Sequence, residues 1–172
     1  MSDVASPTGG SALKWTCDQD GDEMHLRLEG DIDENANLFE IKSVVSGRVR
    51  IDLGQVRRIN SAGVRDWVNF IRELEPITES LALVDCSPAI VMQMNMIANF
   101  RGTAEVRSIY APFACPACDH EQDGRIELTD AVVAALPDDL PTFQCDECGE
   151  TLELDDIPER YFGFLRLYAA NP

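Results

Sequence analysis

Two pairs of cysteines constrain this chain more than any other feature of its sequence. Cys115 and Cys118 form one Cys-X-X-Cys pair, and Cys145 and Cys148 form the other. Two thiolates at this spacing can bind one metal ion from a tight turn, and a second pair completes a tetrahedral site with no open coordination position. The pattern predicts one structural Zn²⁺ per chain, bound by Cys115, Cys118, Cys145 and Cys148. Redox-active dithiols and structural disulfides are the alternatives for these four cysteines.

The sequence between the two pairs is longer than in most zinc ribbons, so a loop or a short helix must be inserted there. We therefore predict a zinc-ribbon-like C-terminal module over residues 110–172, with a helix over residues 129–136. Its strands are expected near residues 110–114, 125–128, 142–144 and 151–154. A further amphipathic helix is expected after Pro158, where apolar residues recur at helical spacing, namely Tyr161, Phe164, Leu165 and Tyr168. This helix should pack between the two parts of the chain or pair with a second copy as a homodimer.

The charge of the chain argues against binding to nucleic acid. The chain has 31 acidic residues and 14 lysines and arginines, which gives a formal net charge of −17. Residues 111–172 alone hold 14 acids against 3 arginines, a net charge of −11. Phosphates would be repelled by such a surface, and it offers no basic stripe to release counterions. We expect the C-terminal module to be structural or to bind protein.

The N-terminal sequence and the hydropathy pattern indicate a cytoplasmic protein. No apolar run approaches the length that crosses a bilayer, so no membrane insertion is expected. The first residues do not resemble a signal peptide, which places the cysteines in a reducing compartment where metal binding is favoured over disulfides.

Residues 1–12, rich in Ser, Gly and Pro, are predicted to be a disordered leader. Residues 13–109 alternate between strand-like and helix-like patterns in the order ββαβαβαβ, which predicts an α/β domain with a mixed sheet and crossover helices. The strands are expected around residues 15–17, 24–28, 49–53, 81–84 and 104–109. The helices are expected around residues 36–45, 64–74 and 88–99.

A short polar loop precedes the second of these helices, and Ser61 lies within it. Free backbone N–H groups and the helix dipole favour an anion at such a position, so phosphorylation of Ser61 would be stabilised there. The alternative is an ordinary N-cap, in which Asn60 or Ser61 only satisfies the first turn of the helix.

Residues 24–108 resemble a STAS domain, the fold of anti-sigma-factor antagonists. Three stretches carry the resemblance. Residues 28–33 (Leu-Glu-Gly-Asp-Ile-Asp) resemble the family's turn before its first helix, and residues 49–53 (Val-Arg-Ile-Asp-Leu) resemble its central strand. Residues 59–64 (Ile-Asn-Ser-Ala-Gly-Val) resemble the loop that holds the family's phosphorylated serine.

The resemblance implies a non-enzymatic partner switch. In the family, this loop docks on a kinase-type anti-sigma factor, and phosphorylation of the serine breaks the complex. Carried over to this chain, Ser61 is the phosphoacceptor, and Asn60 stands where the family usually has Asp. The surface expected to bind the protein partner consists of Asp31, Asp33, Asn60, Ser61, Ala62 and Gly63.

Another class of function fits the same sequence. The C-terminal module could make the chain a constitutive scaffold or adaptor subunit of a signalling or transport assembly, with a structural zinc site and no phosphorylation. An enzyme is not expected, because the sequence shows no Ser-His-acid set, glycine-rich phosphate loop or open metal site.

Overall fold

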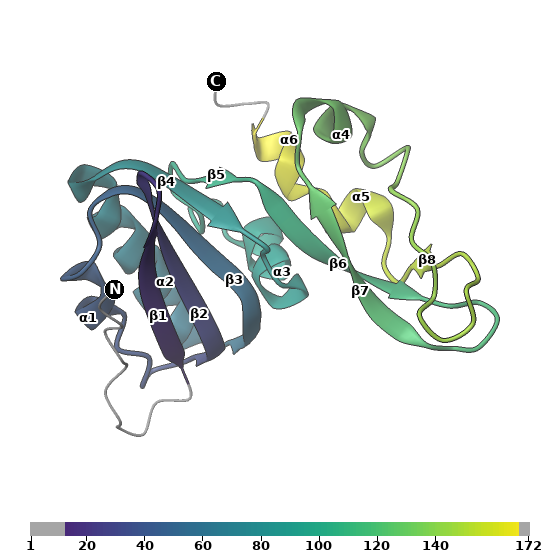
Figure 1. Ribbon diagram of the computed structural model, residues 1–172, viewed down its shortest axis with the longest axis horizontal. Helices are drawn as coiled ribbons and strands as arrows, with labels where there is room; N and C mark the ends of the chain where they lie inside the picture. Colours follow the sequence, from purple (N-terminus) through teal and green to yellow (C-terminus); the bar gives the residue numbers. More distant parts are fainter. Residues whose placement is uncertain (1–12, 169–172) are drawn as a thin grey trace.

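The computed structural model describes residues 13–168, and the leader predicted over residues 1–12 lies outside them. The first part of the chain forms a mixed five-stranded sheet in the order β1-β2-β3-β4-β5, with α1 and α2 behind it (Figure 1). The first two strands are antiparallel and the other neighbouring pairs are parallel, which confirms the predicted α/β class. The strands are β1 (Lys14–Asp20), β2 (Glu23–Ile32), β3 (Gly47–Ile59), β4 (Thr78–Val84) and β5 (Glu105–Val106). The helices are α1 (Leu38–Lys42), α2 (Ser61–Leu74), the 3₁₀ helix η1 (Glu75–Ile77) and α3 (Pro88–Met96).

The core lies between this sheet and its helices. In the central strand β3, Val49, Ile51 and Leu53 are fully buried, as the alternation of side chains along a strand requires. Trp67 of α2 is also fully buried, stacks on Phe100 and donates its indole N–H to the Phe100 carbonyl at 2.9 Å. The indole nitrogen therefore has a partner in the apolar core.

The other face of the sheet carries charged side chains arranged in ion pairs. Its centre is His25 of β2, which is only 8% exposed. Burial lowers the pKa of His25, and the nearby charges of Arg27 and Arg50 lower it further. The neutral ring accepts a hydrogen bond at Nδ1 from Arg27, 2.8 Å away. This face is thus held by polar contacts, whereas the helix-covered face holds the apolar core.

The rest of the chain forms a smaller antiparallel sheet in the order β7-β6-β8. Its strands are β6 (Ser108–Ala114), β7 (Glu121–Glu127) and β8 (Glu153–Leu154), and its helices are α4 (Asp130–Ala135), α5 (Pro158–Tyr161) and α6 (Phe164–Tyr168). The inserted helix predicted over residues 129–136 is confirmed as α4, which Thr129 caps by accepting a hydrogen bond from the Val132 N–H. The strand predicted near residues 142–144 is reduced to a single bridge between Gln144 and Thr151.

The strand β6 connects the two sheets. The strand predicted over residues 104–109 is divided between β5 and β6, and the predicted domain boundary at residues 109/110 falls inside β6. On the edge that faces away from β7, the β6 residues Ser108 and Tyr110 exchange backbone hydrogen bonds with Cys86 at 3.0 and 2.8 Å. As Figure 1 shows, the ribbon of β6 and β7 continues outward from the edge of the first sheet.

The C-terminal segment packs within the chain, between α3 and β6. The single helix predicted after Pro158 is instead two short helices, interrupted at Phe162 and Gly163. Tyr161, Phe162, Phe164 and Leu165 are buried, and the Tyr161 hydroxyl donates to the Tyr110 carbonyl at 2.6 Å. The side chain of Tyr168 lies outside the described ones. Asn95 of α3 explains the interruption: its amide nitrogen donates to the Tyr161 carbonyl at 2.9 Å, and its amide oxygen accepts from the Phe164 N–H at 2.6 Å.

Replacement of Asn95 should therefore loosen the C-terminal helices. We expect Asn95→Ala to lower the free energy of unfolding by about 1–3 kcal/mol, because it removes the hydrogen-bond partners of two backbone groups in a closely packed contact. Urea denaturation measures this change. Asn99→Ala, at an exposed position just after the same helix, is the control and should have little effect. Equal stability of the two variants would contradict the role given to Asn95.

Candidate functional site

The four cysteines lie in two turns with the same backbone geometry. In the first, the Cys115 carbonyl accepts from the Asp119 N–H at 3.0 Å, and in the second the Cys145 carbonyl accepts from the Gly149 N–H at 2.9 Å. The residue after each pair has a positive φ, 57° for Asp119 and 77° for Gly149. Glycine adopts this conformation freely and aspartate tolerates it. Both turns thus end in a residue with a left-handed backbone conformation.

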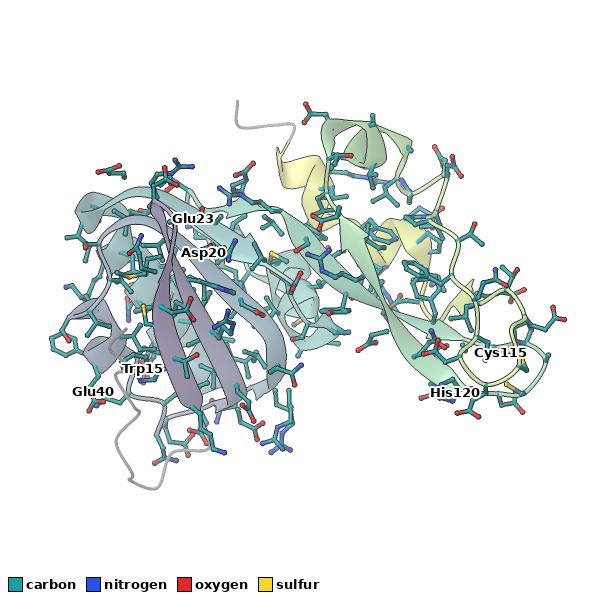
Figure 2. All side chains as sticks on the ribbon, viewed as in Figure 1. Trp15, Asp20, Glu23, Glu40, Cys115 and His120 are labelled. Carbon is teal, nitrogen blue, oxygen red and sulfur yellow. The ribbon has the colours of Figure 1, made fainter. Side chains whose placement is uncertain are left out.

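The turns bring all four sulfur atoms together at the tip of the β6–β7 ribbon, where Figure 2 labels Cys115. All four Sγ atoms lie within 4.8 Å of one another. The Cys115–Cys148 and Cys118–Cys145 sulfur pairs are 3.4 and 3.6 Å apart. A tetrahedral metal with bonds of about 2.3 Å to sulfur holds its ligands about 3.8 Å apart, so the cluster fits such an ion.

The protein environment favours the thiolate at Cys115, whereas the hydrogen bond of each with the Cys115 sulfur raises the pKa values of Cys118 and Cys148. Cys115 and Cys145 are buried, and Cys118 and Cys148 are exposed. Burial acts to raise the pKa of the Cys115 thiol, but hydrogen bonds from the backbone N–H groups of Ala117 and Cys118 outweigh it, and the pKa falls to about 7. Thiolate is the form of cysteine that binds metal. The cluster is therefore a candidate metal centre.

His120 does not belong to this cluster, although it follows the first cysteine pair. Within residues 13–168, the group of side chains that could hold a metal comprises the four cysteines. His120 contributes its backbone carbonyl, which accepts from the Cys115 N–H at 2.9 Å and closes the first turn.

The second candidate site is the N-terminus of α2. Asn60 is the N-cap: its side-chain oxygen accepts from the Gly63 N–H at 2.8 Å. Ser61 is the first residue of the helix and is exposed. Of the two capping residues considered from the sequence, the structure thus assigns the cap to Asn60, which leaves the Ser61 hydroxyl at the surface.

The end of β2 lies against the start of α2. The Asn60 N–H donates to the Ile32 carbonyl at 3.2 Å, and a Cβ atom added to Gly63 would lie only 2.0 Å from that carbonyl oxygen. Asp31 and Asp33 flank Ile32, so the six residues predicted to bind a partner come together at one end of the domain. Asp31 itself pairs with Arg58 at 3.0 Å, and the Asp33 carboxylate accepts from the Asn35 N–H at 2.8 Å.

Sequence reasoning missed a polar cluster where the two sheets join. The buried Ser108 hydroxyl donates to the Asp85 carboxylate at 2.6 Å, and Arg125 donates to the same carboxylate at 2.7 Å. Asp85 has a positive φ of 54°. The three residues of this cluster come from separate parts of the chain, so no local sequence pattern could have identified it.

Comparison with known proteins identifies no family for this chain. No family model matches it, and no curated protein matches it. The resemblance to the STAS family therefore remains a prediction from the sequence. Among the described residues, no helix is long and apolar enough to cross a membrane.

The close contact at Gly63 leads to a prediction. Gly63→Ala should lower the free energy of unfolding by about 1–3 kcal/mol or more, because a methyl group there overlaps a backbone carbonyl that cannot rotate away. Thermal or urea denaturation measures the change. Ser61→Ala, two residues earlier at an exposed position, should change stability by no more than about 0.5 kcal/mol. A Gly63→Ala protein as stable as the Ser61→Ala protein would show that α2 does not need this close approach.

Proposed function

We propose that this chain is a non-enzymatic signalling protein, a STAS-like partner switch controlled by phosphorylation of Ser61. The observation that supports the proposal is the division of roles at the start of α2. Asn60 caps the helix and Ser61 is exposed, so the Ser61 hydroxyl can be phosphorylated without loss of the cap. The partner implied by the resemblance is a kinase-type anti-sigma factor, bound by the surface formed by residues 31–33 and 60–63.

A phosphate on Ser61 would strongly change the local charge. The first N–H groups of a helix have no acceptors within the helix, and the helix dipole makes this end partly positive. Phosphorylation adds up to about two negative charges, and the helix end stabilises them. A partner that docks on the unmodified loop would then face a bulky anion, which weakens binding by repulsion from its acids or by steric exclusion.

Glu34 gives the loop a carboxylate although Asn60 replaces the family's aspartate. The Asn60 amide nitrogen donates to the Glu34 carboxylate at 2.8 Å, and this hydrogen bond lowers the pKa of Glu34. A negative charge is therefore present beside Ser61, supplied by the turn after β2. We propose that the kinase recognises the Glu34 carboxylate in place of the aspartate that the family usually has at the position of Asn60.

Substitutions of Ser61 test the switch. Ser61→Asp should weaken capture of the protein partner from a lysate of the native host by about tenfold or more, because it places a charge in the docking loop. Ser61→Ala should retain capture. Far-UV circular dichroism and metal content should stay unchanged in both variants, which separates lost binding from lost folding. Mass spectrometry of the protein after incubation with the captured kinase and ATP should find the phosphate on Ser61 in the unsubstituted chain.

The second candidate is a constitutive scaffold. The observation in its favour is the firm connection between the two parts of the chain, through the shared strand β6 and through α5 and α6. Such a connection suits a subunit that holds two surfaces in a fixed relation. Equal capture by the Ser61→Asp and Ser61→Ala proteins, with no phosphate on Ser61, would reject the switch in favour of the scaffold.

We also propose that the ion bound by the four cysteines is Zn²⁺ in a structural role. Four thiolates match the ligand preference of zinc and leave no coordination position for water or substrate. Cys115 and Cys118 would hold it from the turn after β6, and Cys145 and Cys148 from the turn before β8. When bound, the ion would supply a cross-link between the two turns.

Elemental analysis of the purified protein should therefore find about one zinc per chain. Cys145→Ser should abolish this and unfold the turns at the tip, as measured by hydrogen exchange, while the five-stranded sheet remains protected. Cys17→Ser, at a half-buried cysteine outside the cluster, is the matched control and should retain the zinc. A Cys145→Ser protein that keeps a full equivalent of zinc would disprove the assignment.

A further inference from the structure

A groove between α1 and α2 lies beside the proposed docking loop. Its volume is about 240 Å³, and its apolar lining comes from Leu38 and Phe39 of α1 and from Phe70 of α2. Pockets for small molecules usually measure about 300–1,000 Å³. The α1–α2 groove is smaller than this and suits a single large apolar side chain.

Phe39 stands at the edge of this groove and is 73% exposed. Among the described residues it is the most exposed large apolar side chain. An aromatic ring in contact with water gains stability by burial against a partner, and aromatic residues beside pockets often dominate the affinity of an interface. The position of Phe39 thus marks the groove as a contact surface.

The charged groups that line the groove are both acidic. Asp66 and Glu73 of α2 border it, with side chains 35% and 43% exposed. Each pairs with a basic side chain of this chain, Asp66 with Arg65 and Glu73 with Lys42, and the Lys42 ammonium also lies 5.8 Å from the centre of the Phe39 ring. Cationic groups are thus already held against the carboxylates and the aromatic ring of this groove. In a chain with a net charge of −17, the complementary partner is basic.

We propose that the α1–α2 groove binds a protein segment in which a large apolar side chain lies next to lysine or arginine. The apolar side chain enters the groove beside Phe39, and the basic side chain pairs with Asp66 or Glu73. The inference rests on the proposed function, because it extends the same docking surface. The turn of Asp31–Glu34 leads into α1, and Ser61 begins α2, so the groove and the loop border one another.

A selection from a random peptide library displayed on phage tests this directly, with the full-length protein immobilised. The enriched peptides should share an aromatic or large aliphatic residue beside Lys or Arg. Their affinities, measured by fluorescence anisotropy, should fall at least about tenfold in Phe39→Ala. Glu73→Gln should reduce both the affinity and its dependence on salt, because it removes one charge from the groove.

Met92→Ala is the matched control, since Met92 is also a large apolar residue, 58% exposed, on the separate helix α3. It should leave the affinities within about twofold. The proposal is overturned if no peptide is enriched, if the enriched peptides lack the apolar–basic pair, or if Phe39→Ala binds them as well as Met92→Ala does.

The outcome is distinguishable from that of the Ser61 experiment. Loss of peptide binding in Phe39→Ala with no effect of Ser61→Asp on partner capture would leave a docking groove without a phosphorylation switch. If partner capture depends on Ser61 but peptide binding is unchanged in Phe39→Ala, the phosphorylation switch is supported and the docking groove is rejected.

Discussion

The arrangement of the two sheets depends on the backbone pairing of β6 with Cys86. This pairing lets a strand that starts at the edge of the first sheet continue as the central strand of the second. Buried backbone groups need hydrogen-bond partners, and β6 finds them in β7 along one edge and in Cys86 and then β8 along the other. The cluster of Asp85, Ser108 and Arg125 stabilises the start of β6, beside the bridge to Cys86.

The C-terminal extension is stabilised in different ways at its two ends. Near the first sheet, α5 and α6 bury Tyr161, Phe162, Phe164 and Leu165 against the rest of the chain, and Asn95 binds the backbone between these helices. At the tip, the two turns each bring one buried and one exposed cysteine into the four-sulfur cluster. The base of the extension is thus held by apolar contacts, whereas the turns at the tip carry the candidate metal centre.

The start of α2 packs closely against the end of β2 while Ser61 stays accessible. Gly63 allows the helix to approach the Ile32 carbonyl, and Asn60 satisfies the helix end with one side of its amide while the other side contacts Glu34. Because Asn60 supplies the cap, Ser61 stands exposed at the first position of the helix. The adjoining groove with its exposed Phe39 adds an apolar contact to the same end of the molecule.

The sequence by itself determined the local features: the strand β3, the helical spacing in α2, the inserted helix α4 and the turns of the two cysteine pairs. These follow from interactions between residues a few positions apart, which a pattern records. The tertiary structure alone decided where distant segments meet. It brought Glu34 to Asn60, divided the C-terminal helix around Asn95, continued β6 into a second sheet and placed α1 beside α2 to form the groove. Each of these contacts joins residues far apart in the sequence. No local pattern of residues records such a contact, because it depends on how the whole chain packs.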